Sequence, residues 1–274
     1  MTRALALSAA LLLGLCACGS RQPPAPGAPA TASPSAQTTS GTPSAGTAAS
    51  AGKSGGHTTG AAAEGPLALP TSSRWKPDVN YDVISPAQPT NAPPDKVQVM
   101  EVFWLACPHC YRLEPYMLAW LKSKADYIQF VRVPIMWGPV QQAHARLFYT
   151  LEALDRDDLV EKAFDTIHHL ETRRGTEAIM IGSSRVETMK LQEAFATRNG
   201  VSAAAFANAY NSFEVNTRLQ QAEQVYQTYQ IQSVPTIIVD GRYRTDPGMA
   251  GGDRQLISLI DFLSKWVHDH RSAP

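Results

Sequence analysis

VQVMEVFWLACPHC, residues 97–110, joins a strand-like run to a closely spaced pair of cysteines. Residues 97–104 are mainly β-branched, apolar and aromatic, with a single carboxylate at Glu101, and this pattern predicts a buried strand. Residues 111–124 place leucine and methionine at the spacing of one helix face. The two cysteines are therefore expected where a strand turns into a helix.

Cys107 and Cys110 are spaced i and i+3, so at a helix N-terminus they are close enough to form a disulfide. A thiolate there faces unpaired backbone N–H groups and the positive end of the helix dipole. This setting makes a cysteine acidic and reactive. The alternatives are a small structural disulfide or half of a zinc site, and no cysteine follows Cys110 to complete the zinc site.

Residues 1–17 predict a secretion signal. Arg3 precedes an apolar run, residues 4–15, which is too short to cross a membrane as a mature helix. The run ends in LCACGS, residues 15–20, which resembles a bacterial lipobox. By that resemblance the signal is cut before Cys18, and Cys18 carries the lipid. The alternative is an ordinary signal peptidase site in the same region, and either reading means that the chain is exported.

Residues 18–74 consist largely of Ala, Gly, Pro, Ser and Thr. Such a composition cannot bury enough apolar surface to offset the entropy lost on ordering, so it predicts a disordered tether. A flexible chain of about 50 residues has a root-mean-square reach of roughly 40 Å.

The chain as a whole is electrically balanced, with 24 Lys and Arg against 24 Asp and Glu. Its sequence contains neither the basic patch of a nucleic-acid-binding protein nor the basic amphipathic helix of a protein that lies on a membrane surface. We therefore expect no nucleic-acid partner. The roughly 200 residues that follow the tether are enough for one domain carrying a subdomain.

The order of the predicted elements indicates an α/β fold. Beyond the first helix we expect a strand at 127–134, helices at 140–154, 158–171, 186–198, 202–211 and 215–229, a hairpin within 234–243 and a last amphipathic helix at 253–267. A strand, a helix and a strand in succession form a βαβ unit with parallel strands. Residues 75–139 and 231–274 are thus expected to form one split domain, with residues 140–230 as a helical insertion.

Several of these features together resemble the DsbA family of bacterial periplasmic dithiol oxidases. They are the Cys-Pro-His-Cys motif, Glu101 six residues before it, the helical insertion, and Val234-Pro235-Thr236 at the next strand. The resemblance covers about residues 95–268. It implies a thioredoxin fold in which the Val234–Pro235 peptide bond is cis and packs beside the active site. The lipid tether departs from the soluble members of the family.

The motif residues are expected to have distinct roles. Cys107, at the exposed start of the helix, is the expected nucleophile, and Cys110, one turn inside, the expected resolving thiol. Pro108 has no N–H to lose in the first turn and suits it conformationally. His109 is either a solvated loop residue or a cation that favours the Cys107 thiolate.

Two further site residues lie outside the motif. Glu101 stands in an otherwise apolar strand, where an unpaired carboxylate would be costly. It is either a satisfied structural carboxylate or, as the resemblance implies, a proton relay beneath the cysteines. Pro235 is either an ordinary proline at a strand start or, by the resemblance, a cis residue that binds the client together with Val234.

Apolar residues around the motif are expected to form a groove for extended peptide, and they include Trp104, Leu105 and Met249. The histidines on the predicted helices have no carboxylate or cysteine partner at ligand spacing, so we expect surface or packing roles for His144, His168 and His169.

The expected function is that of a lipid-anchored periplasmic thiol oxidase, on either the outer or the inner membrane. Its Cys107–Cys110 disulfide is attacked by a thiolate of an unfolded exported client with free cysteines. The resemblance implies that a membrane quinone-linked, DsbB-like partner reoxidises the dithiol, and we expect no metal or organic cofactor. One alternative is a disulfide reductase or isomerase of the same fold, which usually carries a dimerisation module ahead of the catalytic domain. The other is a non-enzymatic tethered binder of peptide or metal.

Overall fold

The computed structural model describes residues 69–169 and 179–271. The expected signal, Cys18 and nearly all of the expected tether lie outside the described residues. Five strands form one mixed sheet in the order β1-β5-β4-β2-β3. They are β1 Asp82–Val83, β2 Val97–Phe103, β3 Ile128–Pro134, β4 Thr236–Val239 and β5 Tyr243–Thr245. The helices are α1 Pro108–Leu121, α2 Pro139–Glu152, α3 Asp158–His168, α4 Arg185–Arg198, α5 Ala203–Tyr210, α6 Phe213–Tyr229, α7 Pro247–Ala250 and α8 Asp253–His270.

Strand β2 is the centre of the sheet, parallel to β3 and antiparallel to β4. All of its residues are buried because helices cover both of its faces. Val97 and Val99 pack with α1 and α8 on one face, whereas Met100 and Val102 pack near the end of α6 on the other. Since side chains alternate along a strand, Glu101 points to the same face as Val99, towards α1.

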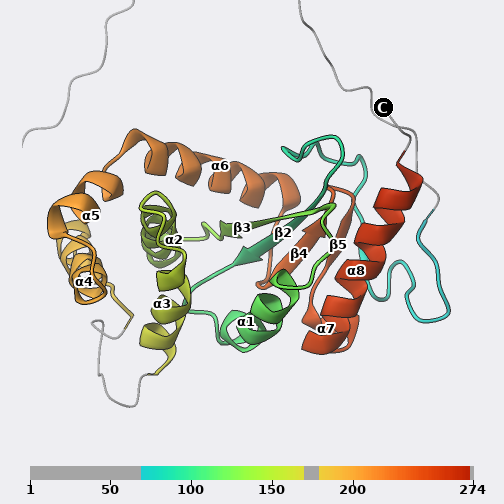
Figure 1. Ribbon diagram of the computed structural model, residues 1–274, viewed down its shortest axis with the longest axis horizontal. Helices are drawn as coiled ribbons and strands as arrows, with labels where there is room; N and C mark the ends of the chain where they lie inside the picture. Colours follow the sequence, from blue (N-terminus) through green and yellow to red (C-terminus); the bar gives the residue numbers. More distant parts are fainter. Residues whose placement is uncertain (1–68, 170–178, 272–274) are drawn as a thin grey trace, which may run out of the picture. The chain divides into compact units, whose positions relative to one another are not determined.

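Helices α2 to α6 stand between β3 and β4 in the sequence, as expected of an insertion. In Figure 1, α2 to α5 lie to the left of the strands, and α8 lies to their right. The insertion has its own apolar core, and the same cluster contains Cys107 and Cys110. Ser184, Ser202 and Ser212 are N-caps whose hydroxyls accept an N–H from the first turn of α4, α5 and α6. Within the described ranges, no helix is long and apolar enough to cross a membrane.

The element order predicted from sequence is confirmed, with boundaries that shift by a few residues. The structure adds two short elements, β1 and α7, which are too brief to leave a periodic signal. The expected hairpin turn is present, because Asp240 and Gly241 have φ of 53° and 63°. A Cβ atom on Gly241 would lie 2.1 Å from the carbonyl oxygen of Gln88, so this turn requires glycine.

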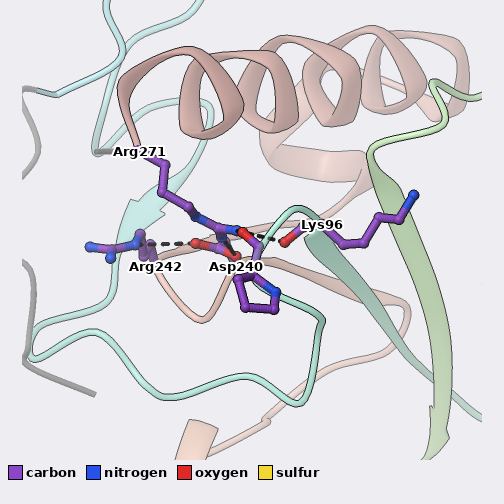
Figure 2. Close-up of polar contacts among 5 residues, drawn as sticks. Lys96, Asp240, Arg242 and Arg271 are labelled. Carbon is purple, nitrogen blue, oxygen red and sulfur yellow. Dashed lines mark hydrogen bonds and ion pairs between the residues drawn. The ribbon is translucent and has the colours of Figure 1, made fainter. Parts of the chain in front are cut away.

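Asp240 also anchors the last helix to the sheet. Its carboxylate accepts hydrogen bonds from Arg271, at the end of α8, and from Arg242, as Figure 2 shows. Arg271 donates in addition to the carbonyl oxygens of Pro94 and Lys96, just before β2. The guanidinium thereby joins the ends of α8, β4 and β2, and α8 in turn packs on α1, which carries the cysteines.

Candidate active site

The Cys-Pro-His-Cys motif lies where β2 gives way to α1. Cys107 is the N-cap residue of α1, with an extended backbone, and its carbonyl oxygen accepts the Tyr111 N–H at 3.0 Å. Pro108 takes the first helical position, where a missing N–H costs nothing. The cysteines therefore occupy the strand-to-helix join that the sequence predicts.

The structure describes the dithiol form, because both cysteines are free. Cys107 keeps 7% of its surface exposed and Cys110 none. The hydrogen bond from the Cys110 side chain does most to lower the pKa of Cys107 to about 6; burial opposes it, and the N–H groups of Cys110 and His109 and the charge of His109 add to it. Burial first, and then Cys107 and Glu101, hold the pKa of Cys110 well above its usual value. At neutral pH the pair is thus a thiolate beside a thiol.

The loop before β4 meets the motif from the other side. Its Val234–Pro235 peptide bond is cis, as the resemblance implies. The carbonyl oxygen of Val234 lies 3.4 Å from Cys107 Sγ. The Thr236 hydroxyl donates to the Ser233 carbonyl at 2.7 Å and closes the turn that leads into β4. Two segments more than 120 residues apart thus meet at one sulfur.

Glu101 is paired with a buried arginine. Arg132, its register partner on β3, donates to it at 2.9 Å. The same guanidinium donates two hydrogen bonds to Glu114 of α1, at 3.0 and 2.5 Å. The pKa of Glu114 is raised, by burial first, although Arg132 opposes the rise. Of the two readings of Glu101, this geometry favours the satisfied structural carboxylate, and neither Arg132 nor Glu114 was predicted from the sequence.

The expectation for the histidines was incomplete. His144 is buried and packs as expected, but its Nδ1 accepts the indole N–H of Trp104 at 2.9 Å. Its Nε2 donates to Ile179, and burial lowers its pKa to about 4, so the ring is neutral. His168 donates to the carbonyl oxygen of Leu105 at 2.9 Å and stacks on Tyr111. Two helices of the insertion therefore hold the residues that flank the motif.

The predicted apolar groove needs one correction. Leu105 has only 1% of its surface exposed, because it packs into the core of the insertion, so it cannot contact a peptide. Trp104 and Met249 are half-buried and remain available. Met249 lines a cavity of about 210 Å³ together with Ser233 and Thr236 of the cis-proline loop.

The described side chains offer no group of three or more His, Cys, Asp or Glu residues that could hold a metal ion. The motif itself offers two thiols of very different acidity. A Cys-X-X-Cys pair at a helix start, beside a cis-proline loop and on a sheet with an inserted helical subdomain, defines a thioredoxin-fold thiol:disulfide oxidoreductase.

Comparison with known proteins names the family. The thioredoxin family model matches residues 92–257. Thiol:disulfide interchange protein DsbA of Burkholderia cepacia is 34% identical over 210 residues, 76% of this chain and 91% of that protein. DsbA of Azotobacter vinelandii is 35% identical over 189 residues, 68% and 81% of the two chains. The crystal structure of Pseudomonas aeruginosa DsbA superposes with a TM-score of 0.62 and 30% identity, over 70% of this chain and 93% of that one.

The chain belongs to the DsbA family of thiol:disulfide interchange proteins. It is an oxidoreductase that introduces disulfide bonds into substrate proteins through their cysteines, and the family works in the periplasm.

Proposed function

We propose that a thiolate of an unfolded exported client attacks Cys107 Sγ of the oxidised protein. The Cys107–Cys110 bond breaks, and Cys110 leaves and takes up a proton because its pKa lies well above its usual value. The second thiolate of the client then attacks the client sulfur of the mixed disulfide and releases Cys107 as a thiolate. The client gains one disulfide, and this protein becomes a dithiol.

The observation that carries this proposal is the asymmetry of the two thiols. Cys107 keeps 7% of its surface exposed and has a pKa of about 6, which makes its thiolate a good leaving group. Cys110 has no exposed surface, so a client cannot reach it. Stabilising the dithiol form favours oxidation of the client over the alternative of a reductase or isomerase.

Val234 and Pro235 are proposed to bind the client chain next to Cys107. The support is that the Val234 carbonyl oxygen already lies beside the reactive sulfur. The cavity at Met249 lies along the same loop, and its mainly polar wall, which includes Gln232, Ser233 and Asp246, would take a polar client side chain.

Pro108, His109 and Glu101 are proposed to act through the cysteines. Pro108 shapes the first turn of α1. His109 is exposed, and its N–H and its charge both favour the Cys107 thiolate. Glu101 helps to keep Cys110 protonated, since its negative charge raises the pKa of that thiol.

We propose that the protein works while held to a membrane by lipid on Cys18, with residues 18–74 as the tether. The support is the lipobox-like sequence at residues 15–20. In a detergent phase-partition assay the wild type should enter the detergent phase, and Cys18→Ser should release it or block processing. Recovery of the wild type entirely in the soluble periplasmic fraction would disprove the anchor.

Each cycle leaves two electrons on this protein as a dithiol, so an oxidant must restore the disulfide. We propose a membrane quinone-linked protein of the DsbB kind for that step. Cells that lack such a protein should accumulate the dithiol form, which thiol alkylation and gel mobility would detect. A disulfide form that persists in those cells would reject this partner.

Trapping the mixed disulfide between Cys107 and its clients tests the proposed chemistry. Cys110→Ala should accumulate mixed disulfides in cells, formed when the Cys107 thiolate attacks a client disulfide, because Cys110 is no longer present to attack Cys107 and expel the client. Cys107→Ala should accumulate none. Mixed disulfides that form equally in both variants would refute the division of roles.

A further inference from the structure

A second cavity lies within the helical insertion, and none of the active-site residues named above lines it. Its volume is about 740 Å³, within the usual range of small-molecule sites. Its walls come from α2, from the loop and first turn of α4, from the end of α5 and from α6. The redox chemistry makes no use of this space.

Two arginines share the cavity wall. Arg146 of α2 is half-buried and donates to the Tyr210 carbonyl at 2.8 Å and to Asn216 Oδ1 at 2.9 Å. Arg185, the first residue of α4, is exposed. Burial, and then the charge of Arg185, lowers the pKa of Arg146, so the two cations lie close enough to repel each other. Tyr210 and Asn216 occupy two of the five N–H donors of Arg146.

No carboxylate in the wall offsets this repulsion. The lining contains no Asp or Glu, and neither arginine forms a salt bridge with any residue that the structure describes. Glu187, in the first turn of α4, is already engaged, because it accepts from Ser183 N and Oγ at 2.7 and 2.5 Å. The remaining wall is mixed: Met136, Pro139, Val140, Ile181 and Leu219 supply its apolar part, and side chains such as Gln142, Thr188 and Gln220 supply its polar part.

We propose that this cavity binds a small organic anion, with its carboxylate or phosphate between Arg146 and Arg185 and its apolar body against the wall at Met136 and Leu219. Bound oxygens would accept from the free guanidinium donors and remove the repulsion between them. The positive end of the α4 dipole acts in the same direction. This site is independent of the thiol chemistry.

Titration calorimetry of the full-length protein tests the site with octyl phosphate, octanoate, 1-octanol and inorganic phosphate at low salt. We expect octyl phosphate or octanoate to bind, and octanol and inorganic phosphate to bind at least tenfold more weakly. Arg185→Gln should weaken binding of the organic anion about tenfold, the worth of one charge-assisted hydrogen bond. Arg198→Gln, at the far end of the same helix and outside the cavity, is the matched control and should bind as wild type does.

Arg185 is exposed, so its variant should keep the wild-type unfolding midpoint and thiol oxidase rate, which separates loss of binding from loss of fold. Three results would overturn the proposal. They are no binding of either organic anion at millimolar concentration, equal affinity for octanol, and equal weakening by Arg185→Gln and Arg198→Gln.

Discussion

Closing the Cys107–Cys110 disulfide removes a thiolate that the fold stabilises, so the stabilities of the two redox forms should diverge with pH. The pKa of Cys107 is about 6 in the folded dithiol, against 9.0 for an unperturbed cysteine. Because the folded value is the lower one, the stabilisation is complete above the unfolded pKa and is lost as pH falls through the folded pKa. The dithiol form should therefore gain stability between about pH 6 and pH 9, and the disulfide form should not share that gain.

Each unit of pKa displacement is worth about 1.4 kcal/mol when fully expressed. Linkage between the folded and unfolded pKa values gives the dithiol about 0.4 kcal/mol at pH 6 and about 2.7 kcal/mol at pH 8. Cys110 acts in the opposite direction, because its folded pKa is raised. Its effect begins only where the unfolded thiol ionises and is below about 0.1 kcal/mol at pH 8. The expected change in the difference between the two forms is about 2 kcal/mol.

The assay is denaturant unfolding of the oxidised and the reduced protein at pH 6 and at pH 8. The quantity to compare is the unfolding free energy of the reduced form minus that of the oxidised form, which should rise from pH 6 to pH 8. Reduced Cys107→Ser is the control, and its unfolding free energy should not show this rise. Cys110→Ala should shrink it, because the hydrogen bond from Cys110 is the main cause of the lowered pKa, whereas Cys110→Ser keeps a donor. A difference between the redox forms that is unchanged or falls from pH 6 to pH 8 would refute the reasoning.

Alkylation at pH 7 should modify Cys107 much faster than Cys110, and Cys107→Ser should abolish oxidation of a reduced model protein; equal alkylation rates would contradict the assignment. Arg132→Met should lower the free energy of unfolding by about 3–5 kcal/mol, because it leaves Glu101 and Glu114 buried without their cation. Adding Glu101→Gln and Glu114→Gln to this variant should recover part of the lost stability. A cost below about 1 kcal/mol would show that water reaches these carboxylates. His168→Phe keeps a ring against Tyr111 but loses the hydrogen bond to Leu105, so it should cost about 1 kcal/mol and shift the Cys107 pKa measured by thiolate absorbance. An unchanged pKa would mean that His168 only packs.

The sequence predicts this fold well because its strongest signals are local. A buried strand, a cysteine pair and an amphipathic helix follow one another within residues 97–124, and each is recognised from its own periodicity. The Asp240-Gly241 turn is likewise decided by two adjacent residues, which both adopt positive φ. The asymmetry of Cys107 and Cys110 also follows from position alone, since one caps the helix and the other lies a turn inside.

The buried ion cluster was missed because it depends on strand register. Arg132 stands in a strand with mixed polarity, and this pattern predicts that an arginine there faces solvent. The pairing of the two strands nevertheless gives some indication of its partner. Once the strands at 97–104 and 127–134 are paired in parallel from their first residues, Glu101 comes opposite residue 131, one residue from Arg132, its partner in the structure. Glu114 then follows as a residue one turn beyond Cys110 on α1, on the side that covers β2.

The contacts of His144 and His168 have no such signal, since nothing in the spacing of residues 104, 105, 144 and 168 brings them together. They show nevertheless how the insertion bears on the reactive sulfur. His144 of α2 accepts a hydrogen bond from Trp104, and His168 of α3 donates one to the Leu105 carbonyl and stacks on Tyr111. The backbone N–H groups that lower the Cys107 pKa belong to His109 and Cys110, which lie between these contacts. The helical insertion therefore contacts the residues on both sides of the motif, and the His168→Phe variant tests whether these contacts reach the acidity of Cys107.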